Sequence, residues 1–236
     1  MEELLYILKL TQIELKQYLD NYLKKNNMKT LNDDGFLYAI GDIPIMLVAH
    51  MDTVFDPPKN LTYEYLNDKL YNQDGGLGGD DRCGIYAIMQ IIKKYKPYVL
   101  FTEDEEIGCI GALKAVDKII KPNLKYIIEL DRRGSVDCVF YDCGNLDFIK
   151  YIESFGFNTQ KGSFSDILFL GNEWNTASVN LSIGYYHEHT KEEYVKYLEV
   201  LETIKKIDAM IKEIDKSPYF SYQSLDIPKY KKKLKR

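Results

Sequence analysis

An apolar run that ends in consecutive acids lies near the middle of the chain, and it constrains the fold more than any other stretch. Tyr98 to Thr102 reads as a buried strand, and Glu103-Asp104-Glu105-Glu106 follows it without a break. Adjacent carboxylates repel one another, so at the end of a buried strand they need a positive partner. In a chain of net charge −5 a metal ion is the commonest such positive partner. A solvated acidic turn is the alternative, and the neighbouring runs decide between the two.

Two other apolar runs end in residue types that bind metals. Ile45 to Ala49 leads into His50-Met51-Asp52, and the run from 124 to 130 leads into Asp131. Runs that are apolar on both faces are typical of the central strands of a parallel sheet, whose carboxyl ends open into the crevice where ligands bind. The sequence therefore predicts an α/β fold with these polar residues gathered at one edge of the sheet.

Length and composition fit one domain over residues 1–236, because 45% of the 236 residues are apolar and no linker or repeat interrupts them. The basic cluster at 229–236 reads as a solvated, flexible tail. The negative net charge gives no support for a nucleic-acid or membrane partner, and no apolar run approaches the roughly 20 residues needed to cross a bilayer. The cysteines form no C-x-x-C pair and the start lacks the features of a signal peptide, so we expect reduced thiols in a cytoplasmic protein.

Local signals predict several further elements. Thr11-Gln12-Ile13-Glu14 is a capping box that starts an amphipathic helix. Thr190-Lys191-Glu192-Glu193 is a second one, predicted to start a long final helix that runs to Ile214. Hairpins are expected around Asn32-Asp33-Asp34-Gly35 and Asn67-Asp68.

The segment before that final helix is predicted to supply one more strand and one more helix. Ser163 or Ser165 is the expected cap of a helix that runs through Leu170. Thr176 to Ile183 is expected to be the last strand, and the chain then runs into His187-Glu188-His189.

A glycine-rich stretch from Gly75 to Gly84 precedes a helical run. It lacks the Gly-Lys-Ser/Thr ending of a phosphate loop and the full spacing of a dinucleotide fingerprint, so nucleotide binding is disfavoured. Small residues let the backbone come close to a metal, while Asp80 and Asp81 start the helix, where the dipole favours negative charge. Asp80 is then free to bridge two ions.

The candidate metal ligands come from strand ends and one helix start: His50, Asp80, Glu106, Asp131 and His189. Two imidazoles and three carboxylates are too many for one tetrahedral catalytic zinc, which needs three protein ligands and an open position. Two metal ions that share one carboxylate fit the set. Asp52 is placed to accept a hydrogen bond from the ring nitrogen of His50 that faces away from the metal. Glu105 is placed to take the proton of a water molecule.

Five motifs in this order resemble the co-catalytic dizinc peptidases, the group that includes peptidase T, related aminopeptidases and carboxypeptidases, and amide-hydrolysing deacylases. The motifs, which span about 45 to 215, are His50-Met51-Asp52, Gly79 to Gly84, Thr102 to Gly108, Leu130-Asp131 and Asn180 to Val195. The resemblance implies a three-layer αβα architecture with a mixed, mostly parallel central sheet, the phosphorylase/hydrolase-like fold of these peptidases.

The resemblance also implies a role for each ligand. His50 and Asp131 would hold one zinc, Glu106 and His189 the other, and Asp80 would bridge them, with Mn²⁺ or Co²⁺ as alternatives to Zn²⁺. Asp52 would orient His50, and Glu105 would be the general base. The family's ending matches His189 better than His187, because Glu193 follows His189 by four residues. His187 is then a neighbouring or substrate-facing residue.

Three further residues are expected near the substrate. The Ser165-Asp166 pair is similar to a Thr-Asp or Ser-Asp pair of the family, which implies that Asp166 positions the substrate. Arg132 and Arg133 follow Asp131 directly, and the rigid fork of either could clamp a substrate carboxylate; a salt bridge to nearby acids is the alternative.

Peptidase T and its nearest relatives carry an inserted lid and dimerisation domain before the last histidine. Between Asp131 and Asp166 this chain has room for only a strand and a helix. If the chain forms an oligomer, we therefore do not expect it to do so through a lid.

The sequence thus predicts a zinc-dependent hydrolase of amide bonds in a small peptide or acylated amino acid. An exopeptidase of the aminopeptidase or di/tripeptidase kind is the first hypothesis, with a metal-bridging water and a Glu base. A deacylase or deacetylase of N-acyl amino acids is the runner-up. A non-catalytic metal-binding interaction protein is the third, and Glu105 argues against it because a purely structural site has no use for such a base.

Overall fold

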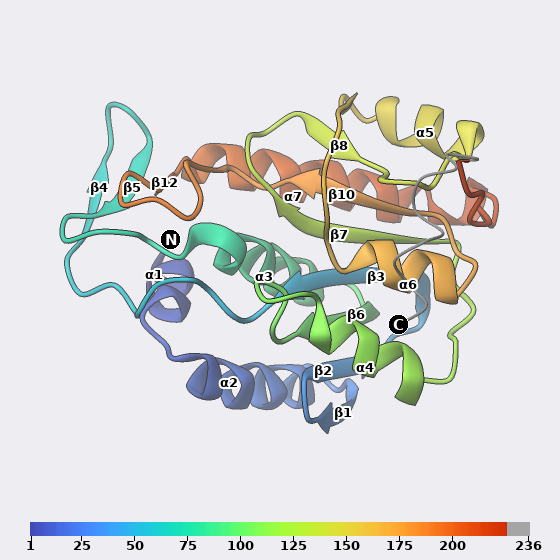
Figure 1. The fold of residues 1–236 in the computed structure, drawn as a ribbon, viewed down its shortest axis with the longest axis horizontal. Coiled ribbons are helices and arrows are strands. Elements are labelled where there is room, and N and C mark those ends of the chain that lie inside the picture. Colours follow the sequence, from blue (N-terminus) through green and yellow to red (C-terminus); the bar gives the residue numbers. More distant parts are fainter. Residues whose placement is uncertain (226–236) are drawn as a thin grey trace.

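A mixed eight-stranded sheet lies at the centre of the computed structural model, which describes residues 1–225 (Figure 1). In spatial order its strands are β1 (Lys29–Asp33), β2 (Phe36–Ile40), β6 (Pro97–Thr102), β3 (Ile43–His50), β7 (Tyr126–Arg132), β10 (Ser178–Ser182), β8 (Asp137–Val139) and β9 (Asn158–Thr159). The basic tail expected at 229–236 lies outside the described residues.

The four central strands, β6, β3, β7 and β10, run parallel to one another. Antiparallel pairing occurs on both sides of them, between β1 and β2, β2 and β6, and β10 and β8. The carboxyl ends of the central strands therefore meet at the same edge of the sheet. The predicted mixed, mostly parallel α/β sheet is confirmed.

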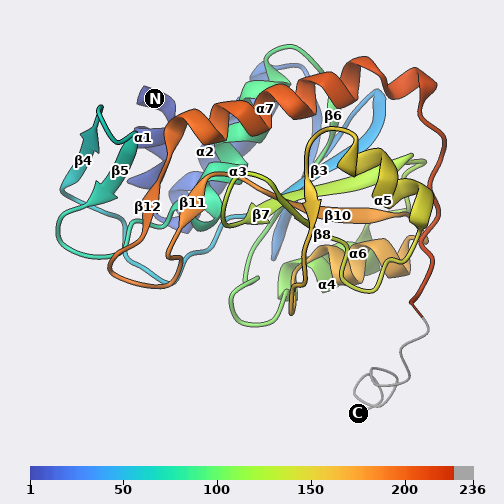
Figure 2. The same ribbon diagram turned by 90° about the horizontal axis from the view of Figure 1, so that it is seen from above.

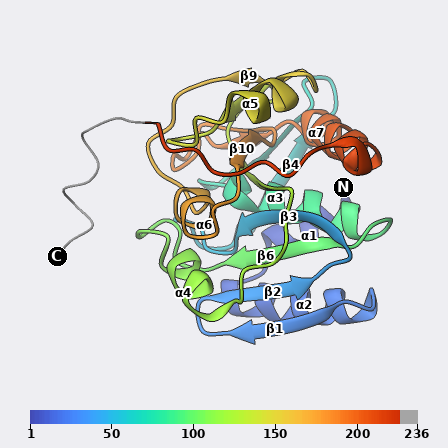
Figure 3. The same cartoon turned by 90° about the vertical axis from the view of Figure 1, so that its right-hand side faces the viewer.

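Helices cover both faces of the sheet, so the molecule has three layers (Figure 3). One face packs against α1 (Glu2–Leu8), α2 (Gln12–Lys25), α3 (Gly79–Ile92), α5 (Leu146–Glu153) and α7 (Tyr197–Lys212), which a short 3₁₀ helix (Ile214–Lys216) follows. The other face packs against α4 (Ile110–Lys118) and α6 (Ile167–Glu173). Alternate residues of β3, β6 and β7 enter the two cores, as a sheet buried on both faces requires.

The first capping box and both hairpins form as predicted. Thr11 Oγ1 accepts the N–H of Glu14 at 3.3 Å, and the Glu14 carboxylate accepts the N–H of Thr11 at 2.9 Å. The first hairpin joins β1 to β2, and the second joins β4 (Leu61–Glu64) to β5 (Lys69–Asn72).

A second, smaller sheet contains elements that the sequence did not predict. It has the order β11-β12-β5-β4, with β11 at Tyr185–Tyr186 and β12 at Tyr194–Val195 (Figure 2). The expected last strand is present as β10, but these two short strands follow it. The second capping box is wrong, because α7 begins at Tyr197 and the Glu193 carboxylate binds the backbone of a distant loop instead.

Between Asp131 and Asp166 the chain forms only β8, α5 and β9. No helix among residues 1–225 has the length and apolar character that a bilayer span requires.

Candidate metal centre

The five predicted metal ligands converge at the carboxyl edge of the central sheet. His50 is the last residue of β3, the acidic stretch follows β6, and Asp131 lies near the end of β7. Asp80 stands at the start of α3, and His189 lies in the loop after β11. The convergence follows from the parallel arrangement of the strands.

Asp80 occupies the centre of this group. Its Oδ1 lies 3.1 Å from Nε2 of His50, and its Oδ2 lies 3.1 Å from Nε2 of His189. Asp131 Oδ1 lies 3.5 Å from the same nitrogen of His50, and Glu106 Oε1 lies 2.8 Å from that of His189. Two half-sites thus share Asp80: one contains His50 and Asp131, and the other contains His189 and Glu106.

The pKa shifts within the group show that its buried carboxylates are stable as anions only beside positive charge. Burial and the nearby charge of Asp80 raise the pKa of Asp131 to about 7. Burial would raise the pKa of Asp80 as well, but contacts with His189 and His50 hold it below its usual value. The hydrogen bond to Asp80 raises the pKa of His189 to about 9. Protonated imidazoles thus supply the counter-charge here, and imidazole nitrogens with carboxylate oxygens are also the donors that a divalent metal such as zinc accepts. His50, Asp80 and Glu106 offer ligand atoms that lie within 4.8 Å of one another, so the residues fit a metal ion.

Asp52 supports the site in two directions. Nδ1 of His50 lies 3.1 Å from the backbone oxygen of Asp52 and 3.3 Å from its Oδ1. The Asp52 carboxylate also accepts the N–H groups of Glu105 at 3.2 Å and Glu106 at 3.0 Å. The first contact agrees with the predicted orienting role, and the second ties the acidic loop to the end of β3.

Glu105 lies beside the ligands without joining them. Its carboxylate accepts a weak hydrogen bond from the Cys109 thiol at 3.6 Å. Burial and the charge of Asp131 raise the pKa of Glu105 to about 9. The carboxylate of Glu106 thus lies next to the imidazole of His189, whereas that of the adjacent Glu105 lies beside the group with no imidazole contact.

A hollow of about 180 Å³ opens over these residues. Its lining residues include Asp80, Glu105, Glu106, Asp131, Arg132, Arg133, Tyr141, Phe164, Tyr185, Glu188 and His189. A small molecule in this hollow can therefore reach four of the five candidate ligands, Glu105 and both arginines, whereas His50 is buried and does not line it.

The two arginines differ in how they are engaged. Arg133 is exposed, and its Nη1 donates to Glu188 at 2.7 Å. Arg132 is half-buried, its Nη2 donates weakly to the carbonyl of Lys161 at 3.4 Å, and its Nε has no partner among residues 1–225. Arg132 Nη2 also lies 3.9 Å from Oδ2 of Asp137, so each arginine has an acid nearby, with the longer contact at Arg132.

Asp166 and His187 lie away from the hollow. Asp166 is fully buried and accepts a hydrogen bond from Thr102, so it lies beneath the site rather than on its open side, where a substrate-positioning residue was expected. His187 is exposed, and its ring packs 5.6 Å from that of Tyr194. Ser165 donates to Glu129 and does not cap α6, whose N-cap residue is Asp166.

Three residues to which sequence reasoning gave no role at the site contact the candidate ligands. Tyr185 donates to Asp131 Oδ1 at 3.1 Å. Asp81 accepts the N–H of His50 at 3.3 Å and that of Gly84 at 3.0 Å, so backbone groups occupy both its oxygens. Glu193 accepts the N–H of Asp80 at 3.0 Å. The spacing of Glu193 after His189 was the one available signal, and the capping-box pattern obscured it.

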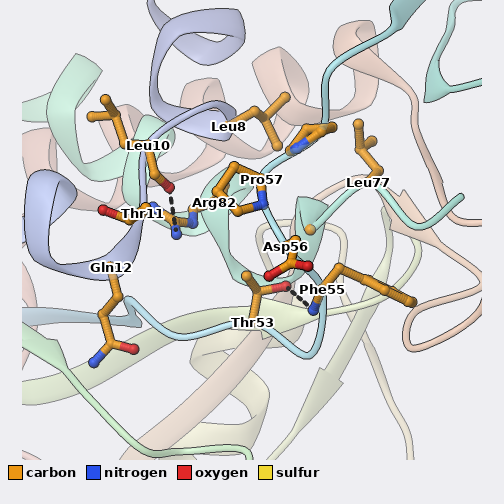
Figure 4. A pocket seen from close by; sticks show the side chains of 12 residues that line it. Leu8, Leu10, Thr11, Gln12, Thr53, Phe55, Asp56, Pro57, Leu77 and Arg82 are labelled. Atoms are coloured by element: carbon orange, nitrogen blue, oxygen red, sulfur yellow. Dashed lines mark hydrogen bonds between the residues drawn. The ribbon is translucent and has the colours of Figure 1, made fainter. Parts of the chain in front are cut away.

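A second hollow, of about 200 Å³, lies near residues 53–58 and α1 (Figure 4). Arg82 lines it and donates to the carbonyl of Leu10 at 3.2 Å, with a longer contact of 3.4 Å to that of Ile7. A cation at the carbonyl end of a helix is a common way to complete it. This hollow shares no lining residue with the one over the metal ligands.

The fold is similar to that of several solved peptidases. Aminopeptidase PepT of Bacillus cereus matches with a TM-score of 0.75 and 14% identity, over 91% of this chain and 97% of that one. A tripeptidase of Staphylococcus aureus matches with 0.74 and 14%, over 90% and 97%. A TET aminopeptidase of a marine sediment Thaumarchaeota archaeon matches with 0.72 and 12%, over 89% and 96%. No protein-family model and no curated protein matches the chain.

Proposed function

We propose that this chain is a metal-dependent exopeptidase that hydrolyses the amide bond of small peptides with two divalent ions, in the first place Zn²⁺. The observation that carries the proposal is the position of Asp80, which directs one carboxylate oxygen to His50 and the other to His189. A carboxylate placed between two imidazoles is what a pair of metal ions with a shared ligand requires. The likeness of the fold to an aminopeptidase and a tripeptidase supports the same function.

In this proposal His50 and Asp131 hold one ion, His189 and Glu106 hold the other, and Asp80 contributes to both. When bound, the ions supply the Lewis acidity that polarises a peptide carbonyl and lowers the pKa of water. Asp52 fixes the ring of His50 through Nδ1, which leaves Nε2 available to the metal. Tyr185 donates to Oδ1 of Asp131, the oxygen that also faces His50, and so positions that carboxylate.

Glu105 is the proposed general base. Its carboxylate lines the hollow and is free of the imidazoles, so it can take a proton from water and give it to the leaving amine. In the metal-free site burial and the charge of Asp131 raise its pKa, and divalent ions bound to the neighbouring carboxylates would lower it toward the deprotonated form that accepts a proton.

The hollow also suggests the size and charge of the substrate. A volume of about 180 Å³ suits one or two amino-acid residues rather than a folded chain. Arg132 is a better candidate than Arg133 for binding a substrate carboxylate, because Glu188 engages Arg133 at 2.7 Å whereas Asp137 lies 3.9 Å from Arg132. A short peptide with a free carboxyl terminus fits this arrangement.

Metal analysis coupled to a substrate screen tests the proposal. The purified protein is loaded with zinc, manganese or cobalt and assayed against dipeptides, tripeptides, aminoacyl amides and N-acyl amino acids. We expect two ions per chain and hydrolysis of unblocked peptides. Cleavage restricted to N-acyl amino acids would identify a deacylase instead. Tight metal binding without any hydrolysis would identify a non-catalytic protein, and fewer than one bound ion under all three loadings would overturn the metal centre.

A further inference from the structure

We propose that Glu193 is a positioning residue that holds Asp80 between the two half-sites. The inference rests on the proposed metal centre and assigns a role that chain spacing alone does not give. Glu193 touches neither imidazole and lines neither hollow, so any effect it has on the metal ions passes through the backbone that carries Asp80.

The Glu193 carboxylate binds three backbone groups of one loop. Oε2 accepts the N–H of Leu77 at 2.9 Å and that of Gly78 at 2.7 Å, while Oε1 accepts the N–H of Asp80 at 3.0 Å. The side chain is buried, with 1% of the residue exposed. Within residues 1–225 no Lys, Arg or His side chain comes within salt-bridge distance of it. The loop amides are therefore the groups that offset the burial of this carboxylate, and they offset it only in part, because burial still raises the pKa of Glu193 to about 7.

The loop needs such an acceptor because its backbone is irregular. Gly78 has a left-handed conformation with φ of 72°, and Asp80 has ψ of 109°, outside the helical range. Asp81 caps the regular turns of α3 by accepting the N–H of Gly84, but the amides just before it, those of Leu77, Gly78 and Asp80, have no local side-chain acceptor. Glu193 supplies the missing acceptor from a position 113 to 116 residues away. The angle at which Asp80 leaves the loop depends on that contact.

The same contact joins the segment that carries Asp80 to the segment that carries His189. Glu193 follows His189 in one continuous loop, and β12, which begins at the next residue, pairs with β5. The fit is close: a Cβ added to Gly79 would lie 2.7 Å from Cγ2 of Val195 and 3.3 Å from Oε1 of Glu193. A shift of Glu193 would therefore displace Asp80 relative to His189 and affect the shared ligand of both ions.

Glu193→Gln tests the inference because it preserves the size of the side chain. The amide NH₂ cannot accept a hydrogen bond, so at least one loop N–H loses its partner. We expect the affinity for the more weakly bound of the two ions to fall by about 10- to 100-fold. We expect kcat to fall by a similar factor, with KM nearly unchanged. The visible absorption of the cobalt-loaded protein should change, because it reports the geometry around the ion. Glu192→Gln, at the exposed neighbouring position, should change none of these.

Gly79→Ala probes the same contact from the other side and keeps the test valid should Glu193→Gln fail to fold. The added methyl group crowds Cγ2 of Val195 and, less closely, Oε1 of Glu193, so it pushes the loop of Asp80 away from the Glu193 segment while leaving the charge of Glu193, and we expect a similar change in cobalt absorption and a smaller loss of affinity. A folded Glu193→Gln protein that binds two ions with parental affinity and an unchanged cobalt spectrum would overturn the inference. If neither the parent protein nor Glu193→Gln hydrolyses any substrate, but their cobalt spectra differ, the proposed function fails and the positioning role stands.

Discussion

His50 and Asp52 are joined at two points, since Nδ1 of the histidine lies 3.1 Å from the backbone oxygen of Asp52 and 3.3 Å from its Oδ1. One of these contacts depends on the side chain and the other does not. His50 thus retains a partner even when the carboxylate is lost, which makes the contribution of the carboxylate measurable.

Asp52→Asn should weaken zinc binding by about 10- to 100-fold, because an amide holds the imidazole less firmly and accepts less strongly from the N–H groups of Glu105 and Glu106. Competition with a chromophoric chelator measures the affinity. Asp56→Asn, at an exposed position four residues on, is the matched control. Equal affinities for Asp52→Asn and the parent protein would show that the backbone contact suffices.

Glu105→Gln should lower kcat by about 10²- to 10⁴-fold and leave the metal content at the parental value, since Glu105 moves a proton and does not hold an ion. Steady-state kinetics with metal analysis of the same sample separates the two effects. Asp104→Asn serves as a control at the preceding position, whose φ of 61° asparagine tolerates. A Glu105→Gln enzyme with most of its activity would remove this residue from the reaction.

Arg132→Ala should raise KM for a dipeptide with a free carboxylate by about 10- to 100-fold, the cost of one charge-assisted hydrogen bond. The same peptide as a carboxyl-terminal amide should show little change. Arg133→Ala should affect both substrates alike, because its guanidinium pairs with Glu188. If Arg132→Ala impairs the amide as much as the acid, Arg132 does not bind the carboxylate.

Zinc affinity should rise with pH. In the metal-free protein contacts with Asp80 and Glu106 raise the pKa of His189 to about 9, above the value of about 6.5 expected in the unfolded chain. The stabilisation that protonated His189 gives the metal-free fold is complete below about pH 6.5 and is lost as pH rises through about 9. Zinc needs the neutral ring, so affinity should increase about tenfold per pH unit for each proton released. Titrations at pH 6.5, 7.5 and 8.5 measure this slope.

Two histidines of one loop provide the test of the pH dependence and its matched control. His189→Gln should lower the affinity and reduce the slope by one proton. His187→Gln should change neither, because the ring of His187 packs on Tyr194 away from the site. A slope that persists unchanged in His189→Gln would assign the proton to another group.

The sequence predicted the parts of the site that depend on strand order. Buried parallel strands place their carboxyl ends together, so the sequence alone predicts that His50, the acidic stretch and Asp131 lie at the same edge of the sheet. The glycine-rich stretch placed Asp80 correctly for a related reason, since small residues allow a close approach to the strand ends.

The residues that were missed depend on contacts over long distances in the chain. The Thr190-to-Glu193 pattern satisfies a local rule for helix starts, but three amides of a remote loop compete for the same carboxylate and define its conformation. The burial of Asp166 depends on how α6 packs against the sheet, and its partner, Thr102, is 64 residues away. Two-residue strands such as β11 and β12 carry too little periodicity to be recognised.

The contacts that complete the metal centre also determine when it can form during synthesis. Glu106 meets His189 across 83 residues, and the loop before α3 meets Glu193 across 113 to 116. A nascent chain that ends before His189 has His50, Asp80, Glu106 and Asp131 but lacks both the second imidazole and the acceptor for the Asp80 loop. Under the proposed function, capture of a pair of ions would be a late event that follows the pairing of the central strands, and a chain interrupted before that point would lack the complete candidate site.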